Sequence, residues 1–130
     1  MRCIAAFPFL IYVKGCVLFM DRNELGRRGE DLAAECLKQK GCIILMKNFS
    51  CRIGEIDIVA RHGSTLIFAE VKTRSGKGYG TPAESVTQYK RRNIIRAAAF
   101  YMQKFNIKGM DVRFDVIEIS FEHIEDAFRI

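Results

Sequence analysis

The stretch GEIDIVARHGSTLIFAEVKTR (residues 54–74) predicts a β-hairpin in which both strands are apolar and both contain charged residues. Two runs rich in β-branched and aromatic residues flank the short connection HGS, which is typical of a tight turn. Asp57 falls inside the first run, and Glu70 and Lys72 fall inside the second. A lone charge is costly to remove from water. We therefore expect these three side chains to have partners.

Hairpin geometry brings the charged residues of this stretch together. Side chains alternate between the faces of a strand, so Glu70 and Lys72 share one face. Pairing about the turn places Asp57 near the Glu70 end of the hairpin, at a distance that depends on the register. An earlier amphipathic helix carries Glu30 on the flank of its apolar stripe, where the carboxylate can point toward the surface on which the helix packs.

Clustered carboxylates repel one another unless a cation neutralises them, and a hard divalent metal does this well. Mg²⁺ is held by one or two carboxylates and keeps water or phosphate oxygens as its other ligands. A neighbouring lysine can orient the attacking water or stabilise a charged phosphate. The pattern therefore suits phosphodiester hydrolysis. The alternative is that Glu70 and Lys72 form a solvated ion pair on an exposed sheet face.

The rest of the chain predicts a single α/β or α+β domain over residues 21–130. The expected elements are a helix over residues 21–40, strands over 42–49, 55–61 and 65–73, a glycine-rich loop over 74–82, a helix from Pro82 or Ala83 to about Phe105 with Thr81 as its cap, and a strand over 111–120. The order α-β-β-β-α-β, in which a hairpin precedes a helical crossover, predicts a mixed central sheet flanked by helices.

The first twenty residues, MRCIAAFPFLIYVKGCVLFM, differ in composition from everything that follows. Their apolar run is too short to span a bilayer, and no small-residue cleavage site follows it. Three interpretations stay open: an upstream extension of a chain whose natural start is Met20, an ordered extra strand or helix, or an export signal. No membrane segment is expected in residues 21–130.

The charge and the cysteines narrow the class of partner and the compartment. A net charge of +6 favours an anionic partner, most often nucleic acid. Five cysteines without a CxxC pair indicate free thiols in a reducing compartment, hence a cytoplasmic protein. A basic cluster marks the first half of the second helix, where it either follows DNA phosphates or forms a solvated face: Lys90, Arg91, Arg92 and Arg96.

Five short motifs together resemble the YraN-like family of small bacterial proteins. The motifs, in chain order, are GRRGEDLAAECLKQKG, KNF, GEIDIVA, FAEVKTR and RFDVIEI. This resemblance implies the PD-(D/E)XK restriction-endonuclease-like fold, which is shared by archaeal Holliday junction resolvases. It also implies the catalytic residues Glu30, Asp57, Glu70 and Lys72, and Mg²⁺ or Mn²⁺ bound mainly by Asp57, Glu70 and the Val71 carbonyl.

The combined pattern predicts a metal-dependent endonuclease-like protein that acts on DNA, with branched or recombination intermediates as candidate substrates. Such two-fold symmetric substrates would require a homodimer. Beside the expected metal, Arg74, Lys77 and Tyr79 are predicted to contact the nucleic-acid backbone. Two alternatives remain, namely a non-catalytic nucleic-acid-binding module of the same fold and a scaffold protein whose charged residues form a structural ion network.

Overall fold

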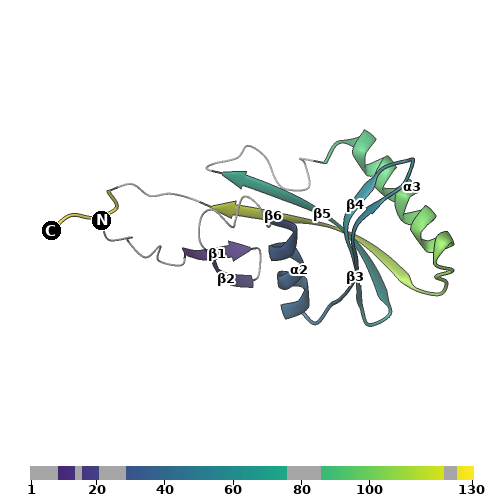
Figure 1. Cartoon of the computed structure of the whole chain (residues 1–130), viewed down its shortest axis with the longest axis horizontal. Helices are drawn as coiled ribbons and strands as arrows, with labels where there is room; N and C mark the ends of the chain where they lie inside the picture. Colours follow the sequence, from purple (N-terminus) through teal and green to yellow (C-terminus); the bar gives the residue numbers. More distant parts are fainter. Residues whose placement is uncertain (1–8, 14–15, 21–28, 76–85, 122–125) are drawn as a thin grey trace, which may run out of the picture.

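The computed structural model describes residues 9–13, 16–20, 29–75, 86–121 and 126–130 of the 130-residue chain (Figure 1). Its elements are β1 (Phe9–Val13), β2 (Cys16–Met20), α2 (Gly29–Gln39), β3 (Ile43–Ser50), β4 (Glu55–His62), β5 (Thr65–Ser75), α3 (Gln88–Lys104) and β6 (Asp111–Phe121). From α2 onward the order is α-β-β-β-α-β, which confirms the architecture expected from the sequence.

The strands form one mixed sheet in the order β2-β1-β6-β5-β4-β3. Neighbouring strands run antiparallel except β5 and β6, which are parallel and are joined through α3. The β4–β5 hairpin turns through two residues, Gly63 and Ser64, and Gly63 has a φ of 58°. A positive φ at the first turn position suits the right-handed twist of a hairpin and favours glycine there.

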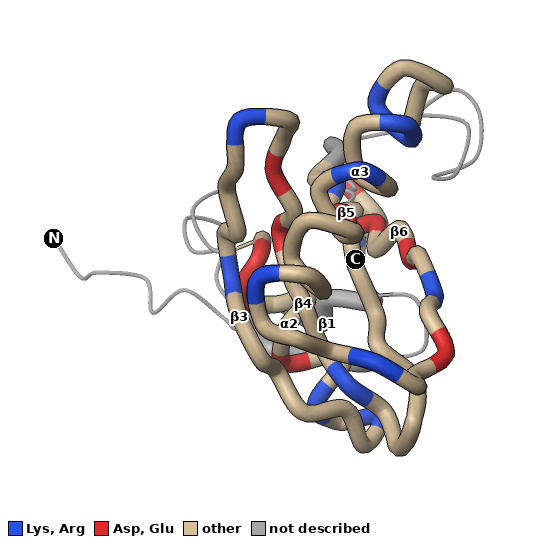
Figure 2. The backbone as a smooth tube through the Cα atoms, turned by 90° about the vertical axis from the view of Figure 1, so that its right-hand side faces the viewer, with Lys and Arg blue, Asp and Glu red and all other residues tan. Residues whose placement is uncertain are grey.

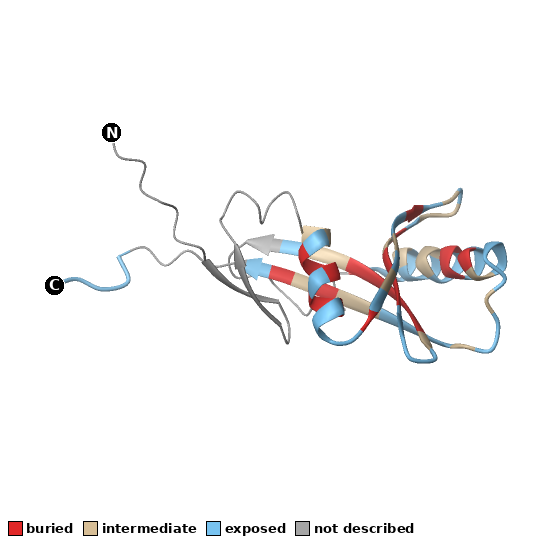
Figure 3. Ribbon diagram, turned by 60° about the horizontal axis from the view of Figure 1, so that its bottom comes forward, coloured by how far each residue is buried: buried red, intermediate tan, exposed pale blue. Residues whose placement is uncertain are grey.

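The two helices cover opposite faces of the sheet, so the domain has three layers (Figure 3). The apolar stripe of α2, which includes Leu32 and Leu37, packs on Ile58, Ile67 and other residues of one face. On the opposite face, Tyr101 of α3 packs with the aromatic residues of the sheet. The exposed residues of α2 are all polar, namely Asp31, Glu35, Lys38 and Gln39.

The start of α3 differs from the expected position. The helix begins at Gln88 rather than at Pro82 or Ala83, and Val86 and Thr87 are not helical. Thr87 is the N-cap, because its hydroxyl accepts a hydrogen bond from the backbone N–H of Lys90 at 3.2 Å. Thr81, the expected cap, lies outside the described residues. Thr81 and Thr87 are both suitable N-cap residues by sequence. We attribute the use of Thr87 to the burial of the neighbouring Val86 side chain.

Strand β5 is longer than expected, because its pairing with β6 continues to Ser75↔Phe121. Arg74 therefore belongs to a strand instead of the glycine-rich loop. Within the described part of the chain, Cys36, Cys42 and Cys51 form no disulfide, as predicted.

The N-terminal segment contributes the β1–β2 hairpin, and β1 meets β6 at Val13↔Ile119. Two strands therefore occur within residues 1–20, in agreement with the interpretation of this segment as an ordered extra element. The interpretation that translation starts at Met20 stays a prediction. Among the described residues, no helix has the length and apolar character needed to cross a membrane.

Candidate functional site

The predicted charged residues meet where β4 and β5 separate. The two strands pair from His62↔Thr65 to Ile58↔Ala69, and no pair continues beyond that point. Past this fork, β4 follows β3 while β5 follows β6. Asp57 lies at the fork, and its Oδ2 accepts a hydrogen bond from the backbone N–H of Val71 at 2.8 Å. The Asp57 side chain thus accepts the hydrogen bond of the Val71 N–H at a point where β4 no longer pairs with β5.

The alternation of side chains along β4 breaks at Asp57. Ile56 packs in the core under α3, whereas Ile58 packs in the core under α2, although a regular strand would place both on one face. On β3, the position between the pairs Lys47↔Ile58 and Phe49↔Ile56 is Asn48, which has a φ of 54°. This irregularity turns the strand at the carboxylate, so Asp57 points into the fork and can meet groups from both faces.

The environment of Asp57 makes its carboxyl easier to protonate than that of a free aspartic acid. Burial raises the pKa of Asp57 to about 6, the hydrogen bond from Val71 opposes this rise, and the charges of Glu70 and Glu30 and a hydrogen bond with Glu70 add to it. Three carboxyl groups from α2, β4 and β5 therefore interact at the fork. Like charges held close together disfavour the ionised state, and Lys72 and Lys90 supply positive charge beside them.

Glu70 is the buried anion of the site, with 7% of its surface exposed. Its Oε1 lies 3.6 Å from Lys72 Nζ and forms an ion pair with Lys90 Nζ from α3. The hydrogen bond and charge of Lys90, together with burial, lower the pKa of Lys72. Burial would lower the pKa of Lys90, but its hydrogen bonds to Glu70 and Lys72 and the nearby carboxylates raise it on balance. Lys90 is therefore the stronger cation, and Lys72 gives up its proton more readily.

Of the four residues predicted to be catalytic, the structure brings Asp57, Glu70 and Lys72 together, and Glu30 acts on Asp57 through its charge from α2. Both polar main-chain groups of a strand residue point to the same side. Since the Val71 N–H points toward Asp57, its carbonyl lies on the side of the fork where the predicted metal would bind.

The predicted nucleic-acid contacts lie in three places. Lys90 points into the site toward Glu70. Arg91 lines a pocket together with Glu70 and Phe68, and it donates from Nε to the Val86 carbonyl at 3.1 Å. Arg92 and Arg96 are exposed one turn apart on α3 and line a shallow pocket of about 300 Å³. The structure places Arg74 near the end of β5, and Lys77 and Tyr79 lie outside the described residues.

Sequence reasoning missed the contact between Lys90 and Glu70. The two residues are twenty positions apart, and they meet only because α3 crosses back over the sheet between the parallel strands β5 and β6. No local pattern distinguishes Lys90 from the arginines that follow it. Asp115 bonds an arginine of its own strand, because Arg113 donates to it twice, from Nε at 2.8 Å and from Nη2 at 3.0 Å.

The donor set at the fork limits which metal it could hold. Among the described residues, no three His, Cys, Asp or Glu side chains are arranged to hold a metal ion by themselves. The fork instead offers two adjacent carboxyls, Asp57 and Glu70, and a main-chain carbonyl. Mg²⁺ fits this arrangement because it retains water or phosphate ligands, whereas a structural Zn²⁺ site needs four protein ligands. A metal ion at Glu70 would compete with Lys90 for the same carboxylate.

The chain is similar to bacterial proteins over most of its length. The family described as "Uncharacterised protein family UPF0102" matches residues 29–119, the segment that contains the site. A UPF0102 protein of Persephonella marina is 46% identical, with 79% of this chain and 91% of the relative aligned. A UPF0102 protein of Geobacter sulfurreducens is 46% identical over 82% of this chain and 89% of the relative. A UPF0102 protein of Caldicellulosiruptor saccharolyticus is 44% identical over 77% and 85%, respectively.

Proposed function

The chain belongs to the UPF0102 family, and from this membership and the geometry of the β4–β5 fork we propose that it is a metal-dependent endonuclease-like protein that acts on DNA. The observation that carries the proposal is the meeting of Asp57, Glu70 and Lys72 where the strands separate. A buried carboxylate, a second carboxyl whose pKa is raised, and a lysine whose pKa is lowered are the groups that phosphodiester hydrolysis uses.

Each residue has a distinct role in this proposal. Asp57 and Glu70 would hold Mg²⁺ or Mn²⁺ together with the Val71 carbonyl, and Glu30 would orient Asp57 from α2. The metal, when bound, lowers the pKa of a water and stabilises charge on the phosphate. Lys72 takes a proton from the attacking water or pairs with a phosphate oxygen, and its lowered pKa favours the first role. Lys90 pairs with Glu70 and balances its charge, and it would release this carboxylate for a metal ligand role.

The proposed substrate is DNA, with branched or recombination intermediates as the candidate class. Arg92 and Arg96 on the exposed side of α3 supply positive charge for the phosphate backbone. Arg74, Lys77 and Tyr79 are proposed contacts in the segment after the catalytic lysine. The net charge of +6 and the free thiols support a cytoplasmic protein that binds nucleic acid.

The test is cleavage of branched, flapped and single-stranded DNA in the presence of Mg²⁺ or Mn²⁺. We expect metal-dependent cleavage by the natural sequence, with a loss of about a hundredfold or more in Asp57→Ala and Lys72→Ala. Glu35→Ala, which removes an exposed carboxylate of α2, is the matched control and should cleave normally. The enzyme proposal fails if none of these DNA forms is cut with either metal.

A second candidate, a nucleic-acid-binding module without catalysis, is favoured by one observation. Two lysines already contact the Glu70 carboxylate, so charge balance at Glu70 is achieved without a metal. This candidate predicts salt-dependent DNA binding that Arg92→Glu weakens and Asp57→Asn leaves unchanged. Calorimetric titration with Mn²⁺ separates the two, because metal binding that disappears in Glu70→Ala supports the enzyme and absence of binding supports the module.

A further inference from the structure

Among the described residues, strand β6 has one edge that no strand pairs with over most of its length. On one side it pairs with β5 along its full extent, from Thr65↔Asp111 to Ser75↔Phe121. On the other side it pairs with β1 at Val13↔Ile119 only. Within the described part of the chain, no strand therefore pairs with residues 111–117 on this side, and Figure 2 shows this edge at the right-hand margin of the sheet.

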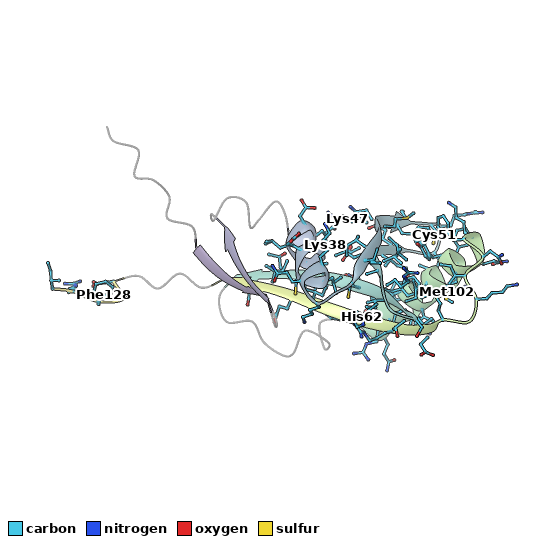
Figure 4. All side chains as sticks on the ribbon, turned by 90° about the horizontal axis from the view of Figure 1, so that it is seen from below. Lys38, Lys47, Cys51, His62, Met102 and Phe128 are labelled. Carbon is cyan, nitrogen blue, oxygen red and sulfur yellow. The ribbon has the colours of Figure 1, made fainter. Side chains whose placement is uncertain are left out.

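Of the strands that the structure describes, β6 and β3 are both long, and each has an edge without a long neighbouring strand, but these two edges are built differently. Strand β3, at the far end of the sheet, has a register shift between Ile44 and Met46 and a left-handed residue at Asn48. It also presents Lys47, which is labelled in Figure 4 and pairs with Asp31 of α2. Bulges and lysines are the devices that keep edge strands from pairing with other chains. Strand β6 has neither: its register is unbroken, and DVRFDVIEISF contains no lysine or proline.

The sequence of the open edge is complementary to itself. When two copies of β6 pair antiparallel about Phe114, Arg113 lies opposite the partner's Asp115, and Val112 lies opposite the partner's Val116. Moving the centre by one residue loses this match, because a centre at Arg113 opposes Asp111 to the partner's Asp115. Within one chain, Arg113 and Asp115 already pair through two hydrogen bonds, so both charges stand at this edge, and in the dimer each would exchange or share its partner with the opposite copy.

The face next to this edge leaves apolar surface exposed. Phe114 is 46% exposed and Val112 is 39% exposed. Phe114 stacks on the buried Phe68 ring with centroids 5.7 Å apart, which places it on the face covered by α3. Residues opposite one another in an antiparallel pair share a face. Both Phe114 side chains of a pair would therefore meet between the two α3 helices and cover one another.

We infer that the open edge of β6 is a dimerisation surface, on which a second copy of this chain adds its β6 antiparallel about Phe114. The contact is isologous, because the same patch is used on both copies. It joins two sheets into one, and its specificity lies in the pairing of Arg113 with the partner's Asp115.

The symmetry of this dimer has a consequence for the proposed nuclease. The two-fold axis of an antiparallel strand pair runs perpendicular to the sheet, so both copies present α3 and the Glu70 carboxylate on the same face. Two sites on one face of a two-fold dimer suit a two-fold symmetric DNA branch. This consequence rests on the proposed function, whereas dimerisation does not, so a monomer that cleaves DNA would overturn the dimer alone.

The test exchanges the charges at Arg113 and Asp115 and measures dimer formation by sedimentation equilibrium. This experiment distinguishes the proposed interface from others. The natural sequence should be a dimer, and Arg113→Asp and Asp115→Arg should each weaken it by roughly tenfold or more, because each places like charges opposite one another. An equimolar mixture of the two single variants should form a heterodimer, because its cross-strand charges match again. The double variant with both exchanges should form a homodimer.

Circular dichroism of each variant confirms folding, and recovery of the dimer on mixing shows that both single variants keep their structure. Leu45→Glu, on the opposite edge strand β3, is the matched control and should leave the association constant unchanged; its side chain is likewise exposed, at 42%. A monomeric natural sequence at high micromolar concentration overturns the inference. Single variants that dimerise as well as the natural sequence, or a mixture that stays monomeric, overturn it equally.

Discussion

Replacing Asp57 by asparagine should stabilise the metal-free protein at neutral pH. The asparagine side-chain oxygen still accepts the hydrogen bond from Val71 N–H, and its amide nitrogen can donate to Glu70, as a protonated aspartic acid does. What the substitution removes is the negative charge, which is held at a partly buried position next to two other carboxylates. The variant thus imitates the protonated state of Asp57, which folding makes easier to reach than in a free aspartic acid.

The magnitude follows from the pKa of Asp57, which rises from 3.8 to about 6 on folding. Each pKa unit corresponds to about 1.4 kcal/mol, so the ionised carboxylate costs the folded state at most about 3 kcal/mol. Solvent screening at this half-exposed position reduces the expected gain in Asp57→Asn to about 1–3 kcal/mol at pH 7.5. Because the pKa is raised, the stability contributed by the proton is fully present below about pH 3.8. It is lost as the pH rises through about 6.

Urea unfolding followed by circular dichroism, in EDTA and at several pH values between 4 and 8, measures this difference. The advantage of Asp57→Asn should be largest at pH 7.5 and should disappear near pH 4. Glu35→Gln is the matched control, since the same chemical change at an exposed position should alter the free energy of unfolding by less than about 0.5 kcal/mol. The reasoning is refuted if Asp57→Asn is no more stable than the natural sequence at pH 7.5, or if its advantage persists unchanged in acid.

Three further substitutions test other parts of the structure, each by urea unfolding. Lys90→Met should lower the free energy of unfolding by about 1–2 kcal/mol, because it leaves the buried Glu70 with Lys72 alone, and adding Glu70→Gln should recover part of the loss. Thr87→Ala should cost about 1 kcal/mol by removing the cap of α3, whereas Thr87→Ser should be nearly neutral. Phe68→Ala should cost about 3–5 kcal/mol because the side chain is fully buried, and a smaller loss would contradict its place in the core.

Local patterns in the sequence were sufficient for the element order and for most of the site. The alternation in β5 placed Glu70 and Lys72 on one face, and the two-residue turn then brought Asp57 to the same end of the hairpin. These relations depend on residues close in the chain, where strand geometry leaves few choices. Glu30 was predicted to approach from a helix because it flanks the buried stripe of α2, and its charge does act on Asp57.

Other features depend on packing between distant segments and were not predictable. The break in alternation at Asp57 requires β4 to leave β5 and to follow β3, a choice that no local pattern specifies. The contact between Lys90 and Glu70 requires the docking of α3, and the choice of Thr87 as the cap depends on where Val86 is buried. The N-terminal strands were one of three alternatives because their apolar run fits several environments.

The fork between β4 and β5 also has a consequence for the order of folding. The β4–β5 hairpin closes a turn of two residues, so the contact between Asp57 and Val71 can form early. Lys90 reaches Glu70 only after the crossover through α3, which closes a longer loop and is therefore slower. In the interval, the carboxyls at the fork lack this lysine, and their repulsion opposes closure of the hairpin end. Docking of α3 should then be the step that stabilises the carboxyls at the fork. We therefore expect Lys90→Met to speed unfolding and to slow the last phase of refolding.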